Sequence, residues 1–107
     1  KITKSKLGSA IAAVKPLTKS DGLISFPIDG FTLAVDFAYS ENLLPLLDQL
    51  DRIVIANGGR VYLAKDARLS GKSFKQMYSN SLEKWELIRE KYQVKRNFTS
   101  AMFNRLQ

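Results

Sequence analysis

The first third of the chain alternates between apolar and polar positions with the period of a β-strand. Residues 31–37, FTLAVDF, place large apolar side chains on one face and small or polar ones on the other. Residues 9–17, SAIAAVKPL, are small and compatible with a strand. LISFPIDGF at 23–31 predicts a further short strand, and its Asp29-Gly30 pair predicts a hairpin turn into the alternating segment.

Helical spacing begins after residue 42. Apolar side chains repeat every three or four positions from Leu43 to Val54, which predicts an amphipathic helix. Asn42 is expected to cap its start, and the NGG run at 57–59 is expected to end it with a left-handed glycine. RVYLAK at 60–65 then predicts another strand.

The remaining residues predict helices. Residues 70–78 form one helical region, and Asn80 with Glu83 resembles a capping box, which predicts a second helix over 81–92. SAMFNRLQ at 100–107 predicts a last short helix. The side chains expected to face the core are Phe74, Met77, Leu82, Trp85, Ile88 and Tyr92. The order β-β-β-α-β-α-α predicts an α+β fold, in which helices pack on one face of an antiparallel or mixed sheet.

The composition excludes several kinds of chemistry. The 107 residues contain no cysteine and no histidine, so disulfides, thiol catalysis and imidazole ligands are absent. There is no phosphate-binding glycine loop, no Rossmann fingerprint and no Ser/His/Asp set. Hence neither a metal site nor a hydrolase triad is expected.

The charge of the chain is compatible with an anionic partner, but taken alone it favours a solubilising role. Seventeen basic against ten acidic residues give a net charge of +7, which suits nucleic acid, anionic lipid or a phosphorylated ligand, or serves solubility alone. A basic nucleic-acid-binding module is therefore one alternative, although GRVYLAKD offers Tyr62 without the aromatic pair of sheet-based RNA modules. Trp85, Phe74, Phe98 and Phe103 have helical core spacing and are expected to pack. A small-ligand or dimerisation domain is a further alternative.

The predicted sheet has one sparsely covered face. It carries small and polar side chains, namely Ala13, Thr32 and Ala34. Lys15, which shares this face with Ile11, and Lys65 each close a predicted strand. One explanation is that each lysine is solvated, or that Lys65 is paired with Asp66. The other explanation is that each is a cation placed where negative charge develops during a reaction. Together they predict a pocket for a flat, anionic ligand.

Several stretches carry a resemblance to a known family. These are SAIAAVKPL, the run from residue 23 to residue 68, FKQMY and FTSAMFNRL, and the strongest is GGRVYLAKDAR at 58–68. From about Ser9 onward the chain resembles the C-terminal end of FAD-linked oxidoreductases of the vanillyl-alcohol-oxidase superfamily. Within that superfamily it is most similar to the decaprenylphosphoryl-ribose oxidases and more distantly to sugar-lactone oxidases.

The resemblance implies a role for each candidate residue. Lys65 matches the family's YxAKD lysine, which stabilises the negative charge of the reduced flavin ring. Tyr62 is implied to lie near the flavin, or to pack. Lys15 is implied to contact substrate oxygens or phosphate from the pocket strand, which also carries Ile11 and Ala13. Thr32 and Ala34 stand at pocket positions where the family has asparagine and cysteine, so the resemblance does not fix the exact substrate.

The resemblance also implies a context. Residues 1–107 are expected to be the C-terminal part of a substrate domain, inactive alone, in a protein that oxidises a secondary alcohol of a sugar or lipid-phosphate sugar by hydride transfer to FAD. The implied partners are the protein's own FAD-binding domain, the sugar or phospho-sugar substrate, and a reductase as in an epimerase pair; no nucleic acid is expected. The family's Asp-Pro after the long helical region is replaced by Gln93-Val94-Lys95, so the final connection is expected to differ.

Overall fold

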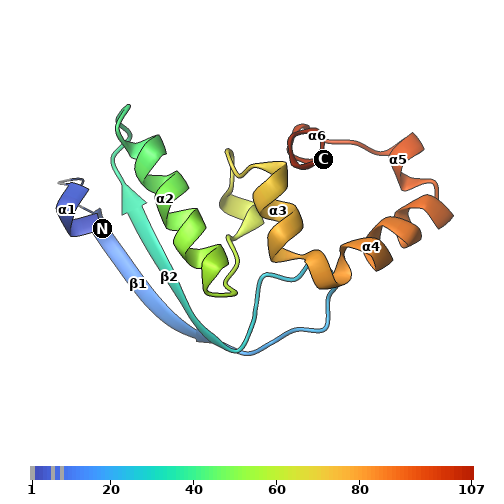
Figure 1. Cartoon of the computed structure of the whole chain (residues 1–107), viewed down its shortest axis with the longest axis horizontal. Coiled ribbons are helices and arrows are strands. Elements are labelled where there is room, and N and C mark those ends of the chain that lie inside the picture. Colours follow the sequence, from blue (N-terminus) through green and yellow to red (C-terminus); the bar gives the residue numbers. More distant parts are fainter. Residues whose placement is uncertain (1, 6, 8) are drawn as a thin grey trace.

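The fold is an α+β arrangement, as the sequence predicted (Figure 1). It is seen in a computed structural model that describes residues 2–5, 7 and 9–107. A two-stranded sheet lies at one end of an elongated molecule, and helices occupy the rest. The elements in chain order are α1 (Ile2–Ser5), β1 (Ser9–Leu17), β2 (Gly30–Phe37), α2 (Leu43–Ala56), the 3-10 helix η1 (Leu63–Lys65), α3 (Gly71–Met77), α4 (Ser79–Lys91), α5 (Val94–Asn97) and α6 (Ala101–Leu106).

The sheet is made by β1 and β2, which run antiparallel. Val14 lies opposite Leu33, and Lys15 lies opposite Thr32. The strands predicted at 9–17 and around 31–37 are therefore confirmed. The predicted hairpin is wrong, because β2 pairs with β1 across the connection 18–29 and residues 23–29 form no strand.

Hydrogen bonds from other segments explain why residues 23–29 do not pair as a strand. The Arg60 guanidinium donates to the Ser25 carbonyl, and the Ser81 hydroxyl donates to the Leu23 carbonyl. The backbone N–H of Lys19 donates to Asp29 Oδ1 at 2.8 Å, so this aspartate closes a long loop where the sequence predicted a two-residue turn. The carbonyls that a strand would offer to a neighbour are thus bound to the helical part of the molecule.

The strand predicted at 60–65 is also wrong. The backbone N–H of Val61 donates to Met77 Sδ at 3.1 Å, which draws this segment toward α3. Lys65 N–H and Asp66 N–H donate back to the carbonyls of Tyr62 and Leu63, each at 3.2 Å, and these bonds form η1. Apolar residues of this kind form a strand only where a neighbouring strand provides backbone hydrogen-bond partners. Here the backbone hydrogen bonds are made within the turn itself.

Helix α2 follows its prediction closely. Leu43 and Leu46 are buried at its start, and Gly58 adopts a left-handed φ of 70° just after its end. Gly59 N–H then donates to the Val54 carbonyl at 2.8 Å, which closes the last turn. Asn42 stands at the N-cap position, but its side chain makes no capping hydrogen bond, so that detail of the prediction is wrong.

The predicted boundary between the next two helices needs correction. Ser70 caps α3 by accepting a hydrogen bond from Ser73 N–H at 3.1 Å. Helix α4 begins at Ser79, directly after α3, so Asn80 lies inside it and caps nothing. Tyr78 joins the two helices, and its carbonyl accepts from Leu82 N–H. The predicted short helix at the C-terminal end is confirmed as α6, whereas α1 and α5 were not predicted.

The core lies where α3, α4 and α6 meet. Its buried members are Leu69, Phe74, Tyr78 and Leu106, with Met77, Leu82 and Trp85 packed against them. Ile88 and Tyr92 are exposed, and Arg89 is buried in their place, so the predicted inward stripe is wrong over the second half of α4. Phe98 is also exposed, in contrast to the packing role expected for it.

Tyr78 combines complete burial with an unsatisfied hydroxyl. Its side chain is 1% exposed, and its Oη has no hydrogen-bond partner within the described chain. Burial raises the pKa of this phenol, and the Arg60 guanidinium, 4.9 Å from the ring centroid, partly opposes that rise. Because an unpaired buried hydroxyl costs free energy, Tyr78→Phe should leave the free energy of unfolding unchanged or raise it by up to ~1 kcal/mol. Urea unfolding measures this, and a loss of more than ~1 kcal/mol would reveal a partner for the hydroxyl.

Candidate functional site

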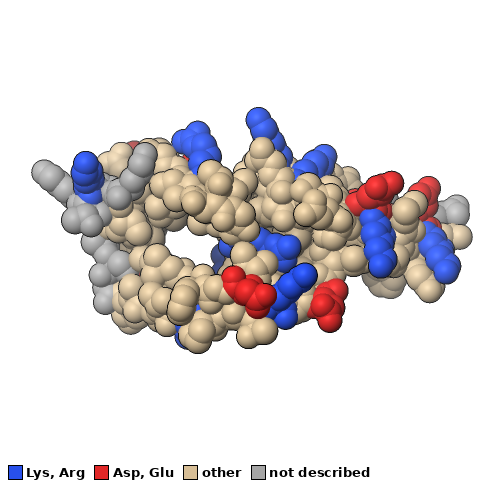
Figure 2. Space-filling view, turned by 60° about the horizontal axis from the view of Figure 1, so that its bottom comes forward, with Lys and Arg blue, Asp and Glu red and all other residues tan. Residues whose placement is uncertain are grey.

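A cavity of about 750 Å³ lies between the sheet and α2. The apolar face of β2 forms one wall with Phe31, Leu33 and Val35, and α2 forms the opposite wall with Leu47, Leu50 and Val54. Leu33 remains 60% exposed, because the helix stripe and the strand face do not reach each other. The space-filling view has an opening here, between the part of the molecule that holds the sheet and the part that holds the helices (Figure 2).

Tyr62 and Lys65 stand on the segment that forms a third wall of this cavity. The Tyr62 ring lies 5.0 Å from the Phe26 ring, tilted by 53°, so part of it packs while the side chain stays half exposed. Lys65 closes η1 and is exposed. The two residues expected to approach a flavin therefore share one cavity, whose walls are mostly aliphatic and aromatic.

Asp66 does not pair with Lys65, although the two are neighbours in sequence. Its carboxylate is 3% exposed and accepts hydrogen bonds from the backbone N–H groups of Arg68, at 3.0 Å, and Leu69, at 2.8 Å. It also forms an ion pair with Arg105 at 2.9 Å. Burial acts to raise the pKa of Asp66, but these hydrogen bonds and the Arg105 charge outweigh it and hold the pKa below its ordinary value.

A second ion pair ties the same segment to α2. Arg68 binds Asp51 through both ends of its guanidinium, with Nη1 and Nη2 each 2.9 Å from a carboxylate oxygen. Asp48 accepts a further bond from Arg68 at 2.9 Å. Such bidentate pairing fixes the orientation of both side chains. The loop that presents Lys65 is thus held on one side by α6, through Arg105, and on the other by α2.

Lys65 takes part in none of the ion pairs found among the described residues. The acid next to it in sequence points inward and is fully used by Arg105 and two backbone N–H groups. The explanation of Lys65 as a partner of Asp66 is therefore wrong in this structure. What remains is an exposed cation at the edge of an apolar cavity, which is either a solvated lysine or the predicted reaction-site cation, on a turn held by two ion pairs.

The five residues predicted to contact substrate lie together on the sheet. Strand pairing sets Lys15 opposite Thr32, Ala13 opposite Ala34, and Ile11 opposite Asp36, so all five share one face. Lys15, Ile11 and Ala34 are exposed on it, and Ala13 and Thr32 are partly so. This face is the reverse of the one that carries Phe31 and Leu33.

The predicted substrate and cofactor residues are therefore not brought into one described pocket. Thr32 lines the cavity with Tyr62 and Lys65, whereas Lys15 and the other three substrate candidates are not among its described lining residues. The two surfaces meet at Thr32, near the start of β2. The expectation that Lys15 and Lys65 flank a single ligand stays a prediction.

Sequence reasoning missed the residues that hold the site in place: Asp51, Asp66, Arg68 and Arg105. The sequence did contain an indication of one of these ion pairs. Asp51 falls within the apolar stripe of α2, where an unpaired carboxylate would be costly, and a buried acid predicts a basic partner. That the partner is Arg68, and that Asp66 binds Arg105 of α6, depends on tertiary contacts between segments far apart in the chain.

Basic side chains are spread over the surface in Figure 2 and are interleaved with acidic ones. No continuous basic stripe follows one element on this face, as nucleic-acid binding through phosphate contacts would favour. Among the described helices, none is both long and apolar enough to cross a membrane.

Comparisons with known proteins relate the chain to an oxidase. No protein-family model matches it. It is 39% identical to decaprenylphosphoryl-β-D-ribose oxidase of Mycolicibacterium smegmatis over 84 residues, which cover 78% of this chain and 18% of that oxidase. It is 38% identical over 88 residues to an uncharacterized protein in the mprA 5′ region of Streptomyces coelicolor, covering 81% of this chain and 24% of that protein. The chain thus spans less than a quarter of the length of these curated relatives, and over most of its own length it is similar to an oxidase.

Proposed function

We propose that this chain is the C-terminal part of the substrate domain of an FAD-dependent oxidoreductase. The intact protein would oxidise a secondary alcohol of a sugar or lipid-phosphate sugar by transfer of a hydride to the flavin. Its partners would be the protein's own FAD-binding domain, the sugar or phospho-sugar, and a reductase that acts on the oxidised product. The local similarity to an oxidase supports this reaction class.

The observation that carries the proposal is the Lys65 ammonium at the edge of an apolar cavity, where it takes part in none of the ion pairs found among the described residues. Flavin presents a flat aromatic ring system whose reduced form carries negative charge at one edge. The aliphatic and aromatic walls of the cavity suit such a ring, and the exposed cation of Lys65 suits its charged edge. The residues present therefore fit the group, and Tyr62 and Lys65 are those that would contact it.

The chain's own residues would contribute position and charge. When bound, the flavin supplies the site that accepts the hydride. Lys65, on a turn fixed by Asp66 and Arg68, would hold a positive charge in place before the reaction starts, so little reorganisation is needed as negative charge develops. Phe31 and Leu33 would exclude water from the apolar wall, and Thr32 would offer a hydroxyl where the cavity meets the sheet face that carries Lys15.

The proposal is tested on the intact protein that contains this chain. We expect it to purify with the visible absorbance of oxidised flavin, and we expect anaerobic addition of a phospho-sugar that has a free secondary hydroxyl to bleach that absorbance. Removal of the hydroxyl by deoxygenation of the same sugar should abolish the bleaching, since no hydride donor remains. A colourless protein that gains no colour with added FAD would contradict the proposal, and tight salt-sensitive binding of a labelled oligonucleotide by that protein would favour the nucleic-acid alternative.

A further inference from the structure

A second cavity, of about 580 Å³, lies among α3, α4 and α6, and none of its described lining residues belongs to the first. Its walls are mainly aromatic and aliphatic, and they include Trp85, Phe103, Phe74, Ile24, Leu63 and Met102. The volume falls within the roughly 300–1,000 Å³ of small-molecule sites. Neither the oxidase reaction proposed above nor the candidate residues from the sequence use this space.

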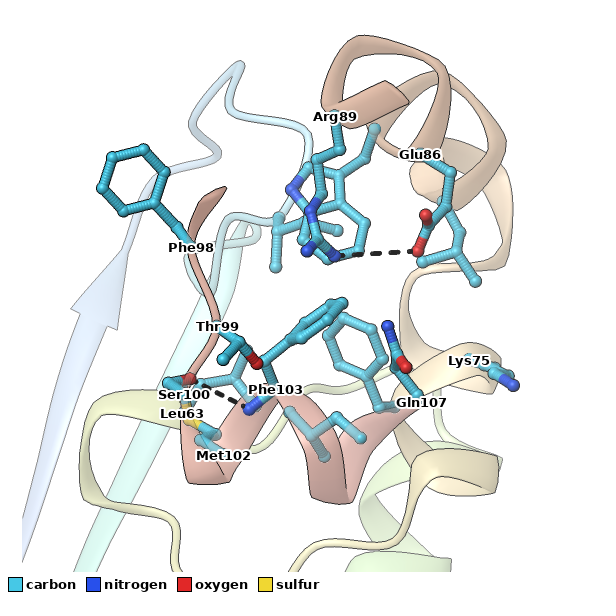
Figure 3. Close-up of a pocket in the computed structure, with 15 residues that line it drawn as sticks. Leu63, Lys75, Glu86, Arg89, Phe98, Thr99, Ser100, Met102, Phe103 and Gln107 are labelled. Carbon is cyan, nitrogen blue, oxygen red and sulfur yellow. Dashed lines mark hydrogen bonds and ion pairs between the residues drawn. The ribbon is translucent and has the colours of Figure 1, made fainter. Parts of the chain in front are cut away.

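Arg89 places its charge inside this apolar space. The residue is 7% exposed, and its guanidinium carbon lies 3.6 Å from the centroid of the Phe103 ring and 4.5 Å from that of Trp85. Figure 3 shows the side chain reaching from α4 toward Phe103 on α6, with its guanidinium directed into the cavity. The buried atom Nη1 has no hydrogen-bond partner within the described chain.

The protein groups near Arg89 account for only part of its bonding capacity. Glu86 Oε1 approaches Nη1 to 4.0 Å, which is an ion pair but is too long for a hydrogen bond. The Trp85 and Phe103 rings stabilise the cation through their faces, but they accept no hydrogen bonds from the N–H groups in the plane of the guanidinium. A purely structural cation–π arrangement explains the stacking but leaves the buried Nη1 without an acceptor within the described chain. A buried guanidinium nitrogen without an acceptor is suited to a carboxylate oxygen, to which it can donate a charge-assisted hydrogen bond.

The charges around the cavity limit the ligand to a low negative charge. Arg89 and Lys75 among the lining residues are balanced in part by Glu86. Lys75 points away from the Arg89 guanidinium in Figure 3, so it attracts anions toward the cavity but does not reach the head group. Any anion on Arg89 therefore meets one nearby cation and the Glu86 carboxylate, and that carboxylate repels a dianionic phosphate more strongly than a monocarboxylate. The apolar walls in turn favour a ligand whose body is hydrocarbon.

We propose that this cavity binds a small amphipathic monocarboxylate, with its carboxylate on the Arg89 guanidinium and its apolar body against Trp85, Phe103 and Met102. The site is separate from the Lys65 cavity, so its occupancy does not depend on a flavin. Trp85 is the only tryptophan in the sequence, and its fluorescence therefore reports directly on this cavity.

The test is a fluorescence titration of the 107-residue chain with octanoate and, in parallel, with octanol. Both probes carry the same hydrocarbon body, and only octanoate carries the charge. We expect saturable changes in Trp85 fluorescence with octanoate, at an affinity about tenfold higher than that for octanol, because a hydrogen-bonded ion pair to a buried guanidinium exceeds a neutral contact. Equal affinities for the two probes, or a signal that does not saturate with octanoate, would overturn the proposal.

Variants test which residues cause the preference for octanoate over octanol. Arg89→Met keeps an apolar stem and should abolish the preference for octanoate, whereas Arg52→Met, an exposed arginine on α2, should leave it unchanged. Glu86→Gln removes the competing carboxylate and should tighten octanoate binding severalfold without affecting octanol. An octanoate preference that survives Arg89→Met, or that weakens in Glu86→Gln, would exclude the assigned role. Should Arg89→Met not fold, the two probes on the unaltered chain and on Glu86→Gln still decide the question.

Discussion

If the intact protein is the flavin oxidoreductase we propose, replacement of Lys65 by methionine should slow its flavin reduction by about 100- to 1,000-fold, the usual effect of removing one preorganised electrostatic contact from a reacting centre. Methionine keeps the length and apolar stem of lysine and removes only the charge. The free energy of unfolding should stay the same, because Lys65 is exposed and has no ion-pair partner within the described chain. Anaerobic stopped-flow measurement of flavin bleaching with saturating substrate gives the rate.

The controls for Lys65 separate a local charge effect from a general one. Lys84 is exposed on α4 and does not line the cavity, so Lys84→Met should reduce flavin at the unaltered rate. Lys65→Arg should recover part of the lost rate, since a cation returns with a different shape. Unchanged reduction kinetics in Lys65→Met would remove the proposed role and leave the lysine as a solvated surface residue.

Replacement of Asp66 by asparagine should lower the free energy of unfolding by about 2–3 kcal/mol at neutral pH. The loss of one partner from a largely buried ion pair leaves the Arg105 guanidinium without its acid, while the side-chain oxygen of asparagine can still accept from the backbone. Asp48→Asn is the matched control, because Asp48 is an exposed partner of Arg68, and its loss should cost less than ~1 kcal/mol. Urea unfolding followed by circular dichroism measures both variants.

The pH dependence of stability identifies the ionised form of Asp66 as the stabilising one. Its pKa is lowered in the folded state from an ordinary value of 3.8, so the folded protein favours the carboxylate. The stabilisation is therefore fully present above that ordinary value and is lost as the pH falls through the lowered folded-state pKa. Asp66→Asn should accordingly flatten the acid side of the stability profile. Equal acid sensitivity in the variant and the unaltered chain would assign the acid transition to other carboxylates.

The two predictions are linked by the position of Lys65 on the turn that Asp66 anchors. Under the proposed function, Asp66→Asn in the intact protein should slow flavin reduction less than Lys65→Met does, because the charge remains but its position is less well fixed. A loss of rate that increases with temperature, alongside the lower stability, would identify Asp66 as a positioning residue.

Local pattern was sufficient for the two strands and for helices α2, α3 and α6, but not for α1, α5 or the start of α4. The spacing from Leu43 to Val54 and the left-handed Gly58 define α2 through interactions within a few residues, which makes them visible in the sequence. The capping box at Asn80 failed because the same residue types also occur inside a helix, and Tyr78 allowed α3 and α4 to follow each other directly. The Asp29-Gly30 turn failed because Asp29 had a more distant partner in Lys19.

The sequence by itself determined the α+β class and the long helix after residue 42, and it singled out Lys65, whose role stays a prediction. These depend on local spacing and on a resemblance carried by short runs. The tertiary structure alone decided that residues 60–65 form a turn, that Asp66 points inward to Arg105, and that the predicted substrate face and the Lys65 cavity lie on different sides of the sheet. The reason is that a buried polar side chain binds whichever partner the fold brings near it. Those partners belong to segments that are far apart in the sequence, so a local pattern does not predict them.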